Sequence, residues 1–200
     1  MDPERLFRLE EWTGQTISGE KVVLLRRFAD WLREEAMAAG GIGPGERNRV
    51  EDRHVLDSLA FAGAWRGHLP QTLVDLGSGS GLPALPLAIL FPSAEVIAVD
   101  RSGRRCRLIR RVSRILDLGN VAVLESDIAD VDIPADVVVS RASLPPEQLH
   151  CHLLRIATPA GVGVVGGSHV AAPSVAGFTT MEVPPEVLDR AVWLLIMARP

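Results

Sequence analysis

Three glycines at alternating positions follow a short apolar run, and an acidic residue precedes them. They are Gly77, Gly79 and Gly81, with Asp75 before them. Glycine adopts positive φ at little cost and lets a ligand approach the backbone closely. A second carboxylate, Asp100, ends the next apolar run, where it can accept hydrogen bonds from both hydroxyls of a ribose. The turn and the two acidic residues therefore indicate a site for a nucleoside-containing ligand.

Three ligands suit a glycine-rich turn of this kind, and the spacing separates them. A dinucleotide site needs its third glycine one position later, where this chain has Leu82. A phosphate loop ends in Gly-Lys-Ser/Thr, which this sequence lacks. The order Asp-x-Gly-x-Gly-x-Gly resembles instead the first motif of class I methyltransferases, which bind S-adenosylmethionine (SAM). A turn that binds NAD, or that is only structural, is the alternative.

The resemblance to class I methyltransferases implies a set of cofactor contacts. The turn would pack against the methionine part and the ribose of SAM, Asp127 would accept from the adenine amine, and Ile128 would pack on the ring. An ordinary polar turn at 126–127 is the alternative. The predicted cofactor-binding residues are Asp75, Gly77, Ser78, Gly79, Gly81, Leu82, Asp100, Arg101, Asp127, Ile128 and Arg141.

Other polar residues are candidates for the substrate side. Arg141 follows an apolar run, and polar residues at the carboxyl ends of parallel strands face the ligand cleft. It could orient the substrate, contact the SAM carboxylate, or only pair with an acid. His54, Asp57 and Ser58 have helical i, i+3 and i+4 spacing, so their side chains can meet; a pair that only caps the helix is the alternative. The predicted catalytic residues are Arg141 and His54, and the predicted substrate-binding residues are His54, Asp57, Ser58, Pro83, Arg105 and Ser140.

Seven arginines and no acidic residue lie between positions 101 and 114. Apolar periodicity predicts a buried stripe made of Leu108, Ile109, Val112, Ile115 and Leu116. The same periodicity places Arg104, Arg107, Arg111 and Arg114 on the outer face of the helix. A solvated helix face and a grip on phosphates are both consistent with this pattern, and Arg101, Arg104 and Arg105 begin the helix nearest the cleft.

Hydrophobic periodicity predicts the elements that position these residues. Residues 3–70 are predicted to be helical. After them, short apolar strands alternate with helices, which predicts a parallel, doubly wound α/β sheet. The last two strands lie close together in the sequence, which predicts an antiparallel edge. The predicted strands are 72–76, 94–100, 121–127, 135–142, 161–167, 177–183 and 191–198.

Composition excludes several classes of protein. No apolar run approaches 18 residues, so no membrane span is expected. The charged start of the chain differs from a signal peptide. Cys106 and Cys151 lie in different elements, which is typical of free thiols in a cytoplasmic protein. The residues indicate no metal site, and the net charge of −4 provides no global basic field.

Four segments occur in the order and spacing of the 16S rRNA guanine-N7 methyltransferase family, also called the glucose-inhibited division protein B family. They are RHVLDSLA (53–60), LVDLGSGSGLPALPLAI (73–89), DRSGRRCRLIRRV (100–112) and VVVSRA (137–142). The chain resembles this family over roughly residues 45–165. The resemblance implies a cytoplasmic, metal-free, SAM-dependent methyltransferase with a Rossmann-like, seven-stranded and mostly parallel sheet. It further implies a helical N-terminal cap, residues 1–70, on a SAM-binding core, residues 71–200.

The substrate side departs from the family pattern. PGERNRVED replaces an Asn-Leu-Thr segment, Gly166-Gly167 replaces Lys-Gly, Asp127 stands where a basic residue is expected, and no basic tail follows. Because RNA recognition depends on phosphate contacts, these changes favour a small heteroaromatic substrate, such as an indole or a purine-like compound of specialised metabolism. The alternatives are guanine N7 of 16S rRNA in the 30S subunit, and a non-catalytic SAM- or RNA-binding module.

Overall fold

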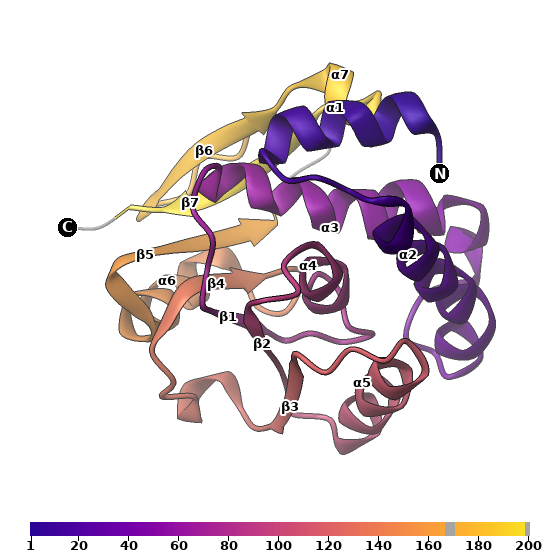
Figure 1. The fold of residues 1–200 in the computed structure, drawn as a ribbon. Coiled ribbons are helices and arrows are strands. Elements are labelled where there is room, and N and C mark those ends of the chain that lie inside the picture. Colours follow the sequence, from indigo (N-terminus) through magenta and orange to yellow (C-terminus); the bar gives the residue numbers. More distant parts are fainter. Residues whose placement is uncertain (167–170, 199–200) are drawn as a thin grey trace.

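Strands that begin at residue 72 and later form one mixed sheet, and helices cover both of its faces (Figure 1). The computed structural model describes residues 1–166 and 171–198. In this part of the chain the sheet has seven strands in the order β3-β2-β1-β4-β5-β7-β6. Their bounds are β1 Thr72–Leu76, β2 Glu95–Asp100, β3 Val121–Glu125, β4 Ala135–Ser140, β5 Ala157–Gly166, β6 Phe178–Val183 and β7 Val192–Met197.

The directions of the strands confirm the predicted sheet. Strands β1 to β5 are parallel to one another, while β7 pairs antiparallel with both β5 and β6. The order of the strands switches sides at β1, since β2 lies on one side of it and β4 on the other, so the carboxyl ends of these strands flank a crevice. The sheet therefore has a Rossmann-like parallel body with an antiparallel edge, as the alternation of elements predicted.

The helices belong to the N-terminal region and to the connections between strands. Helices α1, α2 and α5 each begin at a residue whose side chain accepts from a main-chain N–H of the first turn, which satisfies an amide that the helix leaves free. The described helices are α1 Pro3–Thr13, α2 Gly19–Trp31, α3 Asp57–Ala60, α4 Ala84–Leu90, α5 Gly103–Ile115, α6 Pro146–Ile156 and α7 Pro185–Leu188. Shorter or irregular turns are η1 Leu32–Ala36, η2 Pro44–Arg49, η3 Val50–Leu56, η4 Phe61–Trp65 and η5 Ile128–Asp130.

Successive residues of each strand point to opposite faces of the sheet, and this divides the core in two. Leu73 of β1 belongs to a cluster with the N-terminal helices, α4 and α5, whereas Val74 belongs to a cluster with α6. The N-terminal helices therefore pack on the sheet and share its larger core. None of the helices in the described ranges has the length and apolar character that a membrane crossing requires.

Ion pairs connect the N-terminal helices to the antiparallel edge. Arg5 lies 2.5 Å and Arg8 lies 2.9 Å from the carboxylate of Asp189, which follows α7. Arg190 donates to the Asp57 carboxylate and, at 2.7 Å, to the main-chain oxygen of Asp52. Helix α1 accordingly lies beside α7 at the top of Figure 1, although the sequence separates the two widely.

Helix α5 differs from its predicted packing at one residue. Cys106, Ile109, Val112 and Leu116 are buried, but Ile115 is 42% exposed. The buried stripe follows i, i+3 and i+7 steps from Cys106 and Ile109, and Ile115 falls outside this arc. The prediction that Ile115 is buried is therefore wrong.

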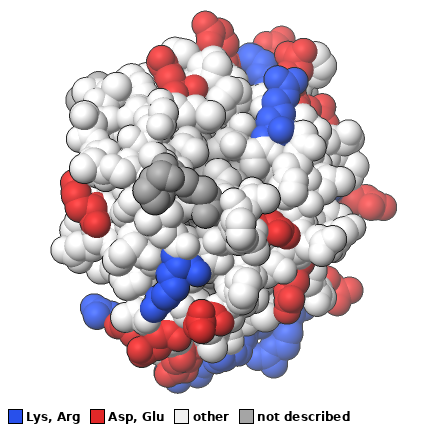
Figure 2. Space-filling model, turned by 90° about the vertical axis from the view of Figure 1, so that its left-hand side faces the viewer, with Lys and Arg blue, Asp and Glu red and all other residues white. Residues whose placement is uncertain are grey.

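Charge is distributed unevenly over the molecule. On the side shown in Figure 2, most of the central surface is uncharged, and side chains of both signs gather toward its margins. Helix α5, by contrast, carries six arginines and no acidic residue. The net charge of −4 is thus a poor guide to the potential at any one surface.

Candidate functional site

The glycine turn after β1 has a backbone that requires glycine. Gly77, Gly79 and Gly81 have φ of +81°, +58° and +85°, a region that other residues rarely adopt. A Cβ atom on Gly77 would lie 2.3 Å from the Cβ atom of Ser143. The turn can therefore pass directly beneath the loop that follows β4, and both segments reach the carboxyl edge of the sheet.

The amides of this turn are committed to the protein. The N–H groups of Gly77 and Ser78 both donate to Val99 O, at 2.9 and 2.8 Å, and those of Gly81 and Leu82 both donate to Ser78 O. A phosphate-binding turn instead directs its N–H groups at the ligand. The turn is consequently not built as an anion cradle, which agrees with a ligand that carries no phosphate at this point.

Asp100 holds the glycine turn from the neighbouring strand. Its carboxylate accepts from Gly79 N–H and from Ser102 N–H, both at 2.9 Å, and Arg105 Nη1 lies 3.6 Å away. A carboxylate has about four acceptor positions, so both oxygens keep capacity for further donors such as ribose hydroxyls. The side chain is 4% exposed and borders a cavity, so its position is rigid.

Asp75 lies beneath the turn. It does not line either of the two cavities that the turn borders. One oxygen accepts from Ala84 N–H at the start of α4, at 3.1 Å. The other oxygen is buried and has no hydrogen-bond partner in the described part of the chain. Burial raises the pKa of this carboxyl group to about 7, against the lowering effects of Ser78, the Ala84 amide and Arg141. The buried carboxyl group of Asp75 is therefore partly protonated near neutral pH.

Two adjoining cavities open at the carboxyl ends of β1, β2 and β4. The first has a volume of about 150 Å³, and the second about 310 Å³. Gly77, Arg105 and Ala142 line both, so the two form one continuous depression. The first is also lined by Asp100, Arg101, Ser126, Asp127, Ile128, Ser143 and Leu144, and the second by Gly41, Ile42, Gly43, Glu46, His54, Ser78, Gly79, Ser80, Leu82 and Arg141.

Arg141 and His54 meet in the second cavity. One guanidinium nitrogen of Arg141 lies 3.4 Å from His54 O and another lies 3.5 Å from His54 Nδ1. On its other side, His54 Nε2 lies 3.4 Å from the Glu46 carboxylate. Burial and the Arg141 charge lower the pKa of His54 to about 4. The ring is therefore neutral at physiological pH, and the long contacts of Arg141 leave its donors available to a ligand.

The predicted face of His54, Asp57 and Ser58 is not formed as expected. Residues 50–56 form a π-helix, whose wider turn disrupts the i, i+3 and i+4 geometry. The carboxylate of Asp57 accepts from Arg190, and Ser58 Oγ donates to the main-chain oxygen of His54 at 2.6 Å. Both side chains are buried and neither borders the two cavities. His54 alone of the three reaches the depression.

Three other predicted residues lie beside the depression without lining it. Ser140 is buried, and its hydroxyl donates to Leu76 O at 2.7 Å, which joins β4 to β1. Pro83 precedes the first residue of α4, and Gly81 packs against Leu85. Direct contact with a ligand therefore stays a prediction for each of these three residues.

Several lining residues were missed by sequence reasoning. Gly41 to Gly43 and Glu46 belong to residues 3–70, which were predicted to be helical, and Ser143 and Leu144 follow β4. The position of the latter pair, directly after a strand in the sheet, is a signal that could have identified them. For the Gly41 loop the sequence holds no such signal, because tertiary packing alone brings it over the glycine turn.

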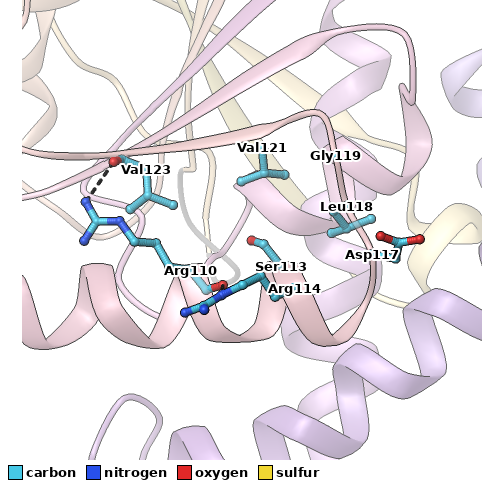
Figure 3. Close-up of a pocket in the computed structure, with 8 residues that line it drawn as sticks. All are labelled: Arg110, Ser113, Arg114, Asp117, Leu118, Gly119, Val121 and Val123. Carbon is cyan, nitrogen blue, oxygen red and sulfur yellow. Dashed lines mark hydrogen bonds between the residues drawn. The ribbon is translucent and has the colours of Figure 1, made fainter.

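A further cavity of about 480 Å³ lies between the end of α5 and the beginning of β3, away from the depression (Figure 3). In the figure, Arg110 reaches from the helix to the strand, where it donates to Val123 O at 3.0 Å. Arg114, Asp117 and Val121 also line it. No group of three His, Cys, Asp or Glu side chains within the described ranges could hold a metal ion.

Comparison with known proteins identifies the family. The family model described as rRNA small subunit methyltransferase G matches residues 21–165. Ribosomal RNA small subunit methyltransferase G of Acidothermus cellulolyticus is 33% identical over 153 residues, which cover 76% of this chain and 68% of that protein. The protein of the same name from Salmonella agona is 33% identical over 154 residues, covering 75% and 73%. The chain belongs to the rRNA small subunit methyltransferase G family.

Membership of this family confirms that the chain is a SAM-dependent methyltransferase. A crystal structure of a mutant MtNAS in complex with S-adenosylmethionine shares the fold, with a TM-score of 0.60 and 20% identity, over 88% of this chain and 72% of that one. The likeness at this identity concerns the fold alone. Both results agree with the class I methyltransferase architecture that the glycine turn predicted.

The expectation of a small heteroaromatic substrate from specialised metabolism is wrong. The matched family and both relatives are named for the RNA of the small ribosomal subunit. The error came from reading net acidity and a few lost basic residues as evidence against RNA. The structure shows why this reasoning fails, since the arginines are concentrated on one helix beside the depression.

Proposed function

We propose that this chain transfers the methyl group of SAM to N7 of a guanine in 16S rRNA, in the cytoplasm. The observation that carries the proposal is membership of a family whose members are named for small-subunit rRNA. The site supports it, because the depression has room for a nucleoside cofactor and opens beside an arginine-rich helix.

The residues present fit SAM. The two cavities together fall within the usual range for small-molecule sites. In this proposal the first cavity holds the adenosine part, with Asp100 accepting from the ribose hydroxyls, Asp127 accepting from the adenine amine, and Ile128 and Leu144 against the ring. The methionine part lies over Gly77 and Gly79, toward the second cavity. Asp75 supports the turn from below through its bond to the Ala84 amide.

The chemistry asks little of the protein in proton transfer. SAM would supply a methyl group bound to a sulfonium; as the lone pair of guanine N7 forms the new N–CH3 bond, the S–CH3 bond would break and the sulfur would leave as a neutral thioether. The protein must therefore exclude water and hold N7 in line with the methyl group, at about 3 Å. A neutral His54 suits this task, because no base is required.

Arg141 is the proposed orienting residue of the second cavity. Its guanidinium group makes only long contacts to His54, burial lowers its pKa, and the charges of Asp57 and Asp75 partly oppose that lowering. An arginine in this setting can donate to the O6 atom of a guanine. That contact would leave N7 of the same ring edge directed at the methyl group.

We further propose that residues 1–70 act as a cap on the SAM-binding core, residues 71–200. Gly41, Ile42, Glu46 and His54 of the cap line the second cavity. The core supplies the lining of the first cavity in full. The cap would then enclose the guanine, while the core alone holds the cofactor.

The test is transfer of labelled methyl from SAM to 30S subunits and naked 16S rRNA that lack this modification. We expect label in the RNA, mapped to N7 of one guanine. Gly77→Ala should abolish transfer, because its Cβ atom would lie 2.3 Å from Ser143 Cβ. Gly19→Ala is the matched control, since a Cβ atom there meets no atom within 4 Å. If the protein binds SAM but neither the 30S subunits nor the naked 16S rRNA acquires label, the proposal is overturned.

A further inference from the structure

Helix α5 carries a charge pattern that does not favour its own stability. Arg104 and Arg105 lie in its first turn, which contains no acidic residue. Positive side chains are unfavourable at a helix N-terminus, because the helix dipole is positive there. Arg107 and Arg111 are i, i+4 neighbours, and like charges at that spacing also repel. The pattern is therefore explained better by an external anion than by folding.

The arginines of α5 differ in what they contact. Arg110 donates to Val123 O, and Arg111 forms a bidentate pair with Glu35 at 2.7 and 3.3 Å. Arg104 and Arg107 are exposed on α5, and within the described ranges neither side chain forms a hydrogen bond or an ion pair with another residue. These two side chains keep all their donors for a partner outside the chain.

Helix α5 starts at the mouth of the depression. Arg105 lines both cavities, and Arg101 lines the first. From there Arg104, Arg107, Arg111 and Arg114 follow one outer face at steps of three and four residues, over about 15 Å at 1.5 Å per residue. We call these four residues the α5 ridge. A nucleic-acid strand that places a base in the depression can run from the mouth along this ridge.

The other elements at the mouth are less suited to phosphate. Glu46 is the lining residue that η2 contributes to the second cavity, and Asp127 lies beside η5 in the first. The Glu125 carboxylate lies against Gly103, on the strand side of α5, and on the outer face the Glu35 carboxylate pairs with Arg111, beyond Arg104 and Arg107. Phosphate groups are therefore attracted most strongly on the α5 side of the mouth.

We infer that the α5 ridge binds the phosphate backbone of the 16S rRNA segment that flanks the methylated guanine. This inference rests on the proposed function. Arg104 and Arg107 supply free guanidinium groups next to the mouth, and the ridge continues to the cavity of Figure 3, which Arg110 and Arg114 line. Such contacts fix position without reading sequence. The base specificity would reside in the depression and the affinity in the ridge.

The test is the double variant Arg104→Gln/Arg107→Gln, compared with the unaltered protein at KCl concentrations between 0.1 and 1 M. Each lost phosphate contact should reduce the slope of log affinity against log salt by about 0.7 to 0.9. If two contacts are lost, the affinity of the variant for naked 16S rRNA, relative to that of the unaltered protein, should be roughly 25- to 60-fold lower at 0.1 M KCl than at 1 M KCl. KM for 30S subunits should rise in parallel, while the Kd for SAM stays the same.

Two controls separate this contact from net charge and from folding. Arg26→Gln/Arg66→Gln removes the same charge from exposed positions on α2 and after η4, and should change the slope little. The midpoint of urea unfolding of the ridge variant should be unchanged or higher, because like-charge repulsion is relieved. If the protein methylates rRNA but the slope of log affinity against log salt is the same for the ridge variant and its control, the inferred role of the α5 ridge is overturned and the proposed function is not. Failure of the unaltered protein to methylate rRNA would overturn the proposed function itself.

Discussion

Replacing Asp75 with asparagine should change how stability depends on pH. Asp75 is fully buried, and its pKa rises from 3.8 to about 7 in the folded protein. Because the folded state holds this proton more tightly than the unfolded state, stability is highest below about pH 4 and falls as pH rises to about 7. A shift of this size corresponds to a loss on the order of 4 kcal/mol. Asparagine does not ionise, so the variant avoids the loss.

The assay is urea unfolding of both proteins at pH values from about 4 to 8. Taking the difference in unfolding free energy at each pH cancels the titration of every other group that the two proteins share. We expect the wild type to weaken relative to Asp75→Asn by on the order of 4 kcal/mol across this range, with most of the change below pH 7. The Ala84 amide can still donate to an asparagine oxygen. A difference that stays constant with pH would show that Arg141 keeps Asp75 ionised, and would refute the reasoning.

Three further predictions follow from the contacts of the cap. His54→Gln should leave the pH dependence of kcat unchanged between about pH 5.5 and 8.5 at saturating SAM, because the pKa of His54 is about 4; an inflection in the wild type that the variant lacks would contradict a neutral role. Arg190→Met should destabilise the protein by about 3 kcal/mol in urea unfolding, because it removes a partner of the 5%-exposed Asp57 side chain; adding Asp57→Asn should recover part of the loss. Gly63→Ala should cost about 1–3 kcal/mol in the same assay, because the new Cβ atom would lie 2.1 Å from the indole of Trp12, and a variant as stable as the wild type would refute that clash.

The parallel core was predictable because its signals are local. Apolar runs ending in a polar residue identified β1, β2 and β4 to within a residue or two. The glycine turn was predictable for the same reason, since three residues at positive φ require glycine whatever surrounds them. Gly77, Asp100, Arg101 and Asp127 line the depression, while their contact with SAM stays a prediction.

The cap side was less predictable because it depends on tertiary contacts. Helical spacing predicted that His54, Asp57 and Ser58 lie on one face, but the π-helix at 50–56 directs them to different partners. The partner of Asp57 is Arg190, far along the chain, and no local pattern links the two. The loop that brings Glu46 over the glycine turn is positioned in the same way.

The contacts between α1 and Asp189 also constrain the order in which the chain can fold. Arg5 and Asp189 are 184 positions apart, so the pair closes a loop that includes nearly the whole protein. Contacts between residues so far apart in the sequence form late, because the entropy of closing the loop is lost before the contact can stabilise the fold. During synthesis at about 5–20 residues per second, Asp189 is made roughly ten seconds or more after Arg5. The core strands can pair during that interval, so the ion pair between Arg5 and Asp189 forms after the parallel sheet.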